Sequence, residues 1–429
     1  MSFFFPSTPS KNTPVRWFAG ISVSANCRRM EAALIGVHGT ESGAPIEIRK
    51  IISFDIPAEI TASFNELQSS VQKKTKDFKV PAALLLHTRR ELASVEEEAI
   101  CELLNEARLP KSDVSAAGIN DPCLYIETPG GLFYQCLCDA AYLAEQTGLN
   151  IVDAFPEQDI AAHGRGGPLF PMPAWVFLKS NIQDRILLDL GQTARITFLP
   201  KAENAFSHQR IKHYDIIPCG SLLDALTAEL TNGKTAFDIG GKLSVQGCRS
   251  EEIRSDLQLL SVPPENWNPC GLPPERYLKT VLRQSNSQLS CQDILCSAGY
   301  FISEKIAESV LGLIEEASAD GSTEPEIVVS GNCRLHGLLM NSLSTQLEQR
   351  PMTVITQLGI PPETFDALCT AMLTVMAVSH IPSSLPHLTG SDTVKTLGRI
   401  TPGSVANWQR LILEMSEIKP AARTLRSAA

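Results

Sequence analysis

The strongest fold signal in this chain is the stretch Asp153-Ala-Phe-Pro-Glu-Gln-Asp159-Ile-Ala-Ala-His-Gly164-Arg-Gly166-Gly-Pro168-Leu-Phe-Pro171. Two shorter stretches follow it toward the C-terminus, Leu385-Pro-His-Leu-Thr389-Gly390 and Leu397-Gly398-Arg-Ile-Thr-Pro-Gly403. None of the three is decisive alone, but their collinear order is a strong indication of fold. Strands and helices alternate in the predicted secondary structure around them, which favours an α/β architecture.

Apolar spacing predicts the main elements around these stretches. Two apolar runs at 17–21 and 32–37 flank polar turns and predict a hairpin between Val15 and Phe54. Helical spacing predicts helices at Glu97–Ala107, Phe301–Ala317 and Thr364–Val378, and a further helix that follows a turn at Gly331 and runs through Leu347. Strands are predicted at Ile186–Gly191, Arg195–Leu199 and Pro325–Ser330, with a polar turn at Gln192 and Thr193.

Length and composition limit the class of protein. A chain of 429 residues with 43% hydrophobic and 20% charged residues is typical of a soluble globular protein with two domains. The net charge of -10 argues against nucleic acid or an anionic membrane as a partner, because both need a positive face. The same charge still allows a locally basic pocket for a phosphate group.

The cysteines and the chain ends indicate a cytoplasmic protein. The 12 cysteines lack the paired C-x2-C spacing of a zinc site, so we expect reduced thiols and no bound metal. The N-terminal run is broken at Pro6 and has no stretch typical of a secretory signal. The most apolar run, from Ala367 to Ile381, is too short and too polar for a membrane span.

The three anchor stretches resemble the anhydro-N-acetylmuramic acid kinase family. The first is similar to the family pattern D-F-R-x-x-D-[VI]-A-A-G-G-Q-G-A-P-L-x-P, and the other two are similar to L-P-x-V-T-G and L-G-x-I-x-P-G. The resemblance runs from about Trp17 to Gly403. It implies an actin-like (ribonuclease H-like) two-domain kinase fold with a central cleft. The expected parts are a disordered tail at 1–14, a first domain at 15–150 plus 386–415, a second domain at 151–385, and a disordered tail at 416–429.

The resemblance also implies an activity, in which ATP and Mg²⁺ serve to phosphorylate 1,6-anhydro-N-acetylmuramic acid in cell-wall recycling. Water opens the internal ether of the sugar while its 6-oxygen takes the γ-phosphoryl group, and an aspartate in G-F-D-T-G-P-G-N acts as the base. Asp215 matches that aspartate, and a positioned carboxylate is suited to removing the proton of water. The alternative is that Asp215 caps a helix that starts at about Ser221.

Three more acidic residues match family positions. Asp366 falls on the glutamate of E-A-x-A-F-A and would assist catalysis, or it could be an acidic residue in the first turn of its helix. Asp139 and Asp159 match acidic positions near the sugar cleft and are candidate substrate-binding residues. A surface or capping role is the alternative for each of these two residues.

The segments that match the nucleotide loops depart from the family pattern. The first family loop, S-G-T-S-x-D-G-x-D, aligns with a stretch that has lost its glycines and carries Ser24, Ala25, Asn26 and Arg28 as the cofactor-binding candidates. In the second loop Gly191 remains of a glycine pair, and in the adenosine loop G-G-G-A-H-N only Gly331 remains. Glycines let backbone N–H groups approach phosphate closely, so these changes are unfavourable for Mg-ATP binding.

Three functions are consistent with this pattern: an active anhydro-sugar kinase, an inactive pseudokinase that acts as a sugar sensor or interaction protein, and a related enzyme with another phosphoryl donor. The expected partner is a small amino sugar, and the family suggests a homodimer. Arg28, Arg195 and Arg334 all replace other residues in the loop segments. They form either a new anion site or three solvated surface arginines.

Overall fold

The computed structural model describes residues 15–39, 44–72, 80–122, 124–128, 131–204, 206–260, 272–284, 289–319, 321 and 323–417. The chain divides into two compact units. The first comprises Met1–Phe177, Asn204–Phe206 and Thr364–Ala429, and the second comprises Leu178–Glu203 and Ser207–Glu363. The predicted tails at 1–14 and 416–429 lie outside the described residues, apart from Ser416 and Glu417, which end a helix.

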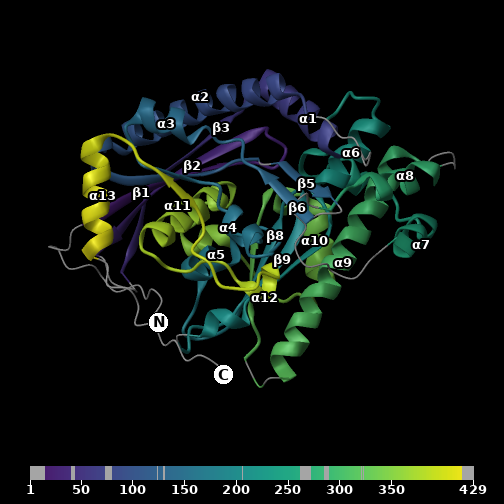
Figure 1. Ribbon diagram of the computed structural model, residues 1–429. Helices are drawn as coiled ribbons and strands as arrows, with labels where there is room; N and C mark the ends of the chain where they lie inside the picture. Colours follow the sequence, from purple (N-terminus) through teal and green to yellow (C-terminus); the bar gives the residue numbers. More distant parts are fainter. Residues whose placement is uncertain are drawn as a thin grey trace. The chain divides into compact units, whose positions relative to one another are not determined.

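The first unit is built on a six-stranded mixed sheet (Figure 1). Its strand order is β13 (Arg399–Thr401), β7 (Ile151–Asp153), β4 (Val114–Asn120), β1 (Val15–Val23), β2 (Arg29–His38) and β3 (Ile46–Asp55). β1, β2 and β3 are antiparallel neighbours, whereas β4 runs parallel to β1 and β7 runs parallel to β4. The predicted hairpin between Val15 and Phe54 is therefore confirmed.

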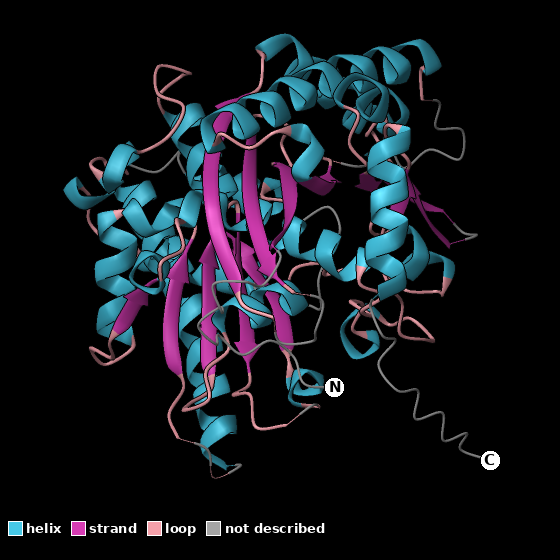
Figure 2. Cartoon of the chain, turned by 90° about the vertical axis from the view of Figure 1, so that its left-hand side faces the viewer, coloured by secondary structure: helices cyan, strands magenta, loops and turns pink. Residues whose placement is uncertain are grey.

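Two helices cover opposite faces of this sheet, which is flanked by helices in Figure 2. On one face, α2 (Ala82–Ala107) buries Leu92 against a cluster that includes Ile21 of β1. On the other face, α11 (Phe365–Val378) approaches β1 so closely that a Cβ atom on Gly20 would lie 2.2 Å from the backbone nitrogen of Ala371. Only a glycine fits at that contact. The predicted helices at Glu97–Ala107 and Thr364–Val378 are confirmed.

Shorter elements complete the first unit. A small hairpin joins β5 (Leu124–Thr128) to β6 (Gly131–Gln135). The remaining helices and 3-10 turns are α1 (Ala58–Gln72), η1 (Lys111–Asp113), α3 (Ala140–Thr147), α4 (Glu157–Ala161), α5 (Pro171–Leu178), α12 (Pro386–Thr389) and α13 (Val405–Glu417), with η7 (Pro362–Thr364) at the boundary between units.

The second unit is built on a five-stranded sheet in the order β10 (Lys212–Pro218), β9 (Thr193–Leu199), β8 (Arg185–Leu190), β11 (Glu326–Ser330) and β12 (Met352–Val354). The first three strands are antiparallel, and β11 and β12 run parallel to β8. If the strands of each sheet are renumbered in chain order, both sheets contain the spatial order 3-2-1-4-5. This repeated arrangement is that of an actin-like, ribonuclease H-like α/β protein, as predicted.

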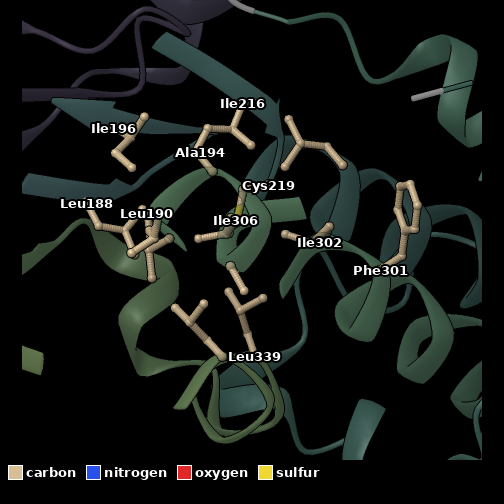
Figure 3. Close-up of a cluster of buried hydrophobic side chains, with 14 of the residues drawn as sticks. Leu188, Leu190, Ala194, Ile196, Ile216, Cys219, Phe301, Ile302, Ile306 and Leu339 are labelled. Carbon is tan, nitrogen blue, oxygen red and sulfur yellow. The ribbon is translucent and has the colours of Figure 1, made fainter. Parts of the chain in front are cut away.

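A large apolar cluster lies between the sheet of the second unit and its helices (Figure 3). Ile196 of β9 and Ile306 of α9 (Cys291–Ala319) are both fully buried in it. The other helices and turns of the unit are η2 (Ser207–Arg210), α6 (Gly220–Leu230), η3 (Ile239–Gly241), η4 (Ser244–Gln246), α7 (Glu251–Leu260), α8 (Glu275–Gln284), η5 (Asn332–Leu335), α10 (Gly337–Gln346) and η6 (Ile355–Leu358).

Some boundaries differ from expectation. The units divide at 177/178 and near 364 rather than at 150/151 and 385/386, because β7 pairs with β4 and α11 packs on β1. The helix expected after Gly331 begins only at Gly337, since His336 caps it by accepting a hydrogen bond from Leu339 N at 3.3 Å. Within the described part, none of the helices is both long enough and apolar enough to span a membrane.

Candidate functional site

The turn between β1 and β2, which matches the first phosphate loop, is closed by its own side chains. Ser24 Oγ accepts hydrogen bonds from the backbone nitrogens of Arg28 at 3.2 Å and Arg29 at 3.0 Å. The same hydroxyl donates to Asn26 Oδ1 at 2.9 Å, and Ala25 and Arg28 are exposed. Amide groups that would face a phosphate in a glycine-rich loop are thus engaged within the turn.

Cys27 helps to hold the same turn through its buried side chain and its carbonyl oxygen. It adopts a positive φ of 51° although it is not a glycine, and its side chain is fully buried. Thr61 of α1 donates a hydrogen bond to its carbonyl oxygen at 2.6 Å. Burial, reinforced by the negative charges of Glu96 and Asp121, raises the pKa of the Cys27 thiol to about 12, so this thiol stays protonated.

In the second unit, the β8–β9 turn and the start of α6 are joined by backbone hydrogen bonds. Cys219 N donates to Gln192 O at 2.8 Å, and Gly220 N donates to Gly191 O at 3.0 Å. Ser221 donates to Gln192 O from both its backbone nitrogen, at 3.1 Å, and its hydroxyl, at 2.9 Å. The carbonyl oxygens at Gly191 and Gln192 therefore anchor the N-terminus of α6.

Gly331 is required by the local backbone. Its φ of 83° and ψ of 161° lie in a region that essentially only glycine adopts. A Cβ atom there would lie 2.4 Å from the carbonyl carbon of Leu190 and 2.7 Å from Asp189 Oδ1. Its carbonyl oxygen accepts a hydrogen bond from Arg334 Nη1 at 2.9 Å. Gly331 therefore has a packing role in this loop that is independent of nucleotide binding.

Asp215 lies in β10, is fully buried and forms an ion pair with Arg195 of β9, with Arg195 Nε 3.0 Å from Asp215 Oδ1. Arg195 is directly opposite Asp215 on one side and Asp189 of β8 on the other, so the three residues form a row across the sheet. Burial raises the pKa of Asp189, and the nearby Arg195 charge partly offsets that effect. The alternative role of Asp215 as a helix cap is wrong, because α6 begins at Gly220 and its N-cap is Cys219.

His213 is a residue of this strand that the sequence did not single out. Its ring is buried, and its Nδ1 is 2.9 Å from Thr197 Oγ1 of β9. Its Nε2 has no hydrogen-bond partner among the described residues. Burial lowers the pKa of His213 to about 4, so the ring is neutral at physiological pH.

The other acidic candidates belong to the first unit. Asp366 is exposed in the first turn of α11, as its alternative role predicted. Asp139 is the N-cap of α3, where it accepts a hydrogen bond from Tyr142 N at 3.3 Å, and Arg90 Nη2 lies 3.1 Å from its Oδ2. These contacts give Asp139 the capping role that was its alternative.

Asp159 is fully buried in α4. Its Oδ2 accepts a hydrogen bond from Gly166 N at 2.9 Å, while its Oδ1 has no hydrogen-bond partner in the described part of the chain. A Cβ atom on Gly164 would lie 2.1 Å from that Oδ2. Asp159 therefore holds the glycine-rich loop at 164–167 by a hydrogen bond to its backbone. Because Asp159 is fully buried, the alternative of a surface role does not apply to it.

The arginines at the loop segments have different environments. Arg28 is exposed, which agrees with a solvated surface arginine. Arg195 and Arg334 differ from that expectation, because the first pairs with Asp215 and the second donates to Gly331 O. Each of these two contacts is made within the second unit.

A buried acidic cluster in the first unit was also missed. Asp121 accepts hydrogen bonds from the backbone nitrogens of Leu137 and Cys138. Glu96 of α2 is fully buried, and neither of its carboxylate oxygens has a hydrogen-bond partner among the described residues. Burial, together with the charges of Asp121 and Asp153, raises the pKa of Glu96 well above its usual value. The available signal was the position of Glu96 on the apolar stripe of its helix.

Comparisons with known proteins agree on one family. The family description "Anhydro-N-acetylmuramic acid kinase" matches residues 24–403. The anhydro-N-acetylmuramic acid kinase of Bordetella petrii is 25% identical over 399 residues, which cover 92% of this chain and 98% of that protein. The corresponding protein of Synechococcus sp. is 27% identical over 350 residues, covering 79% of this chain and 88% of that protein.

Solved structures give more distant similarities. The activator of a 2-hydroxyisocaproyl-CoA dehydratase from Clostridium difficile has 10% identity and a TM-score of 0.39, covering 84% of this chain and 94% of that one. A ROK family glucokinase from Streptomyces griseus has 12% identity and a TM-score of 0.31, covering 84% of this chain and 99% of that one.

The family match covers most of the chain and includes the three anchor stretches in order. This chain belongs to the anhydro-N-acetylmuramic acid kinase family.

Proposed function

We propose that this chain is a pseudokinase of its family, which binds an amino sugar related to 1,6-anhydro-N-acetylmuramic acid without phosphorylating it. The observation that carries the proposal is the ion pair between Arg195 and Asp215. A general base must accept a proton from water, and here one oxygen of the candidate base is already held by a guanidinium group in a fully buried position.

The residues of the loop segments do not fit Mg-ATP well. When bound, ATP would supply the phosphoryl group and Mg²⁺ would neutralise its developing charge. In the first turn, Ser24 already accepts hydrogen bonds from two backbone amides, and Arg28 stands where the family has an aspartate. These contacts do not favour a bound Mg-ATP at the first turn.

The sugar-binding part of the proposal is supported by family membership and by the glycine-rich loop at 164–167. Asp159 holds this loop through Gly166 N, and its second oxygen is buried beneath it. A loop fixed in this way can present backbone groups to a sugar hydroxyl without further ordering. Cytoplasmic location and a homodimer belong to the same proposal, because the family suggests both.

An active kinase is the second candidate, and the retained carboxylates at Asp215 and Asp366 favour it. The experiment is calorimetric titration of the purified chain with 1,6-anhydro-N-acetylmuramic acid and separately with Mg-ATP, followed by mass-spectrometric detection of the 6-phosphate. The kinase from Bordetella petrii serves as the positive control for the reaction.

We expect heat from the sugar, none from Mg-ATP, and no phosphorylated product with ATP or other phosphoryl donors. A product that disappears in Asp215→Asn would overturn the pseudokinase proposal and establish the second candidate. A product formed only with another donor would point to an enzyme of different donor specificity. If the sugar does not bind, the proposed ligand is wrong.

A further inference from the structure

The glycine-rich loop that follows α4 carries one arginine on a firmly held backbone. Arg165 is exposed, and its backbone nitrogen donates a hydrogen bond to Thr389 O at 2.9 Å. The glycines on either side are both bound to Asp159, because Gly164 N donates to Asp159 O and Gly166 N donates to Asp159 Oδ2, each at 2.9 Å. Three consecutive residues of the loop are therefore fixed around the Arg165 side chain.

Pro156, the N-cap residue of α4, lies against this loop and stands where the family pattern has an arginine. When the pattern D-F-R-x-x-D is aligned on Asp159, its arginine falls on Pro156, and the glutamine of G-G-Q-G falls on Arg165. A Cβ atom on Gly166 would lie only 3.0 Å from Pro156 Cβ. The arginine of the pattern and the arginine of this chain therefore belong to the same small region of the first unit.

The other arginine near Pro156 is already engaged. Arg399 of β13 donates two hydrogen bonds to Asp153, from Nε to Oδ1 at 3.1 Å and from Nη2 to Oδ2 at 2.7 Å, and its Nη1 lies 3.6 Å from Glu157 Oε2. By contrast, the Arg165 side chain has no hydrogen-bond or ion-pair partner among the described residues. Arg165 is therefore the guanidinium group of this region that can receive an anionic ligand.

The acidic side chains around the loop have other partners. Asp392, whose backbone nitrogen donates to Ala162 O at 2.9 Å, has its Oδ2 2.7 Å from His163 Nδ1. Asp159 is fully buried and holds Gly166 N. An external carboxylate at Arg165 would therefore not have to displace an existing ion pair.

We propose that Arg165 is the residue by which this chain recognises the carboxylate of its sugar ligand. 1,6-Anhydro-N-acetylmuramic acid carries one such group, on its lactyl ether, and this group is ionised at neutral pH. A planar guanidinium group can bind a carboxylate through two parallel hydrogen bonds, which gives direction as well as affinity. The inference rests on the proposed function, because it assigns the specificity of the same sugar site.

Charge and order both favour this role. The chain has a net charge of -10, so an anionic ligand is repelled at long range unless a local cation offsets that field. Arg165 supplies such a cation, whereas the glutamine of the family pattern would supply only a neutral hydrogen-bond donor. Because the backbone of the loop is already held, binding would order the Arg165 side chain but not the loop itself.

The test is calorimetric titration of the full chain, without nucleotide, with 1,6-anhydro-N-acetylmuramic acid and with its methyl ester. The ester keeps the ring and the ether but carries no charge. We expect the wild type to bind the acid at least about tenfold more tightly than the ester. This preference should shrink when the salt concentration is raised to about 1 M, because Arg165 is exposed and its charge is screened.

Arg165→Gln should bind the acid and the ester with similar affinities. Arg165→Lys should keep part of the preference, since the charge remains but the paired hydrogen bonds are lost. Arg49→Gln, on an exposed position of β3, is the matched control and should keep the full preference. In the double variant Pro156→Arg/Arg165→Gln, part of the preference should return, because Pro156 lies beside the same loop.

The outcomes separate this inference from the proposed function. If the wild type binds neither the acid nor the ester, the proposed ligand is wrong and the role of Arg165 falls with it. If the wild type binds both equally well, or if Arg165→Gln keeps the preference, the role of Arg165 is overturned while sugar binding stands. A folded double variant without any preference would contradict the placement of Pro156 and Arg165 at one carboxylate.

Discussion

Arg195 and Asp215 face each other across β9 and β10, with Arg195 Nε 3.0 Å from Asp215 Oδ1. The aspartate is fully buried, while about a third of the arginine side chain is exposed, at 34%. Removing one partner of such a pair leaves the other charge without compensation, which costs more than the pair itself contributes. The pair therefore makes the second unit sensitive to changes at either residue.

Arg195→Asn should destabilise the second unit by about 2 to 3 kcal/mol, because Asp215 would remain buried without its cation. Urea unfolding followed by circular dichroism measures this loss. In the double variant with Asp215→Asn, part of the loss should be recovered, since the uncompensated charge is gone. Arg276→Asn on the exposed surface of α8 is the matched control and should change little. Equal losses in both arginine variants would contradict the assigned role of the pair.

Gly331→Ala should lower the stability of the second unit by several kcal/mol, whereas Gly359→Ala should cost about 1 kcal/mol. Both glycines have positive φ, 83° and 80°, but only Gly331 has close neighbours, with the carbonyl carbon of Leu190 2.4 Å from a built Cβ. A Cβ at Gly359 would meet nothing within 4 Å. The comparison by thermal unfolding separates the steric effect from the backbone effect. Similar losses in the two variants would show that the turn after β11 can move.

The strands and helices could be predicted from local patterns, whereas the contacts of the site could not. Apolar alternation around Ile186 and Arg195 indicated β8 and β9, and helical spacing indicated α9 and α11. The pairing of Arg195 with Asp215 depends on the register between β9 and β10, which includes an irregularity between Asp215 and Ile217. That register is a tertiary property, so the sequence allowed Asp215 to be taken for a helix cap.

The pattern of glycine losses could be recognised from the resemblance, but its structural outcome could not. Ser24 and Asn26 accept hydrogen bonds from amides of the first turn, and Cys333 donates a hydrogen bond to Gly191 O. The contact between Cys333 and Gly191 joins residues that are far apart in the sequence, so the neighbouring sequence does not specify it. Glu96 is a different case, because its spacing from Leu92 and Ile100 already placed it on the buried face of α2.

The stability of the second unit should fall as the pH drops from about 6.5 toward 4, because His213 is neutral in the folded state. Its folded pKa of about 4 lies below the usual 6.5, so in this window the unfolded chain binds a proton that the folded chain does not. The loss should approach about 3 kcal/mol over the whole window. Urea unfolding at a series of pH values measures it.

His213→Gln should flatten this acid-side decline, whatever it does to the stability at neutral pH. His87→Gln is the control, since His87 is exposed on α2 with a side-chain exposure of 64%. The control should keep the full decline of the wild type. An unchanged slope in His213→Gln would mean that another group binds the proton on unfolding.

Glu96→Gln should stabilise the first unit at neutral and alkaline pH, by about 1 to 3 kcal/mol, because it removes an ionisable group from a buried acidic cluster. The folded pKa of Glu96 is raised, so its contribution to stability is fully present below the usual value of 4.5. That contribution is lost as the pH rises toward the folded pKa. The stability advantage of the variant should therefore shrink toward zero as the pH falls to about 4.5.

Thermal unfolding at several pH values measures the difference in stability, with Glu98→Gln, an exposed neighbour on α2, as the matched control. A destabilised Glu96→Gln protein at pH 8 would indicate that the carboxylate has a cationic partner, and the assignment of Glu96 as an uncompensated buried acid would then be wrong.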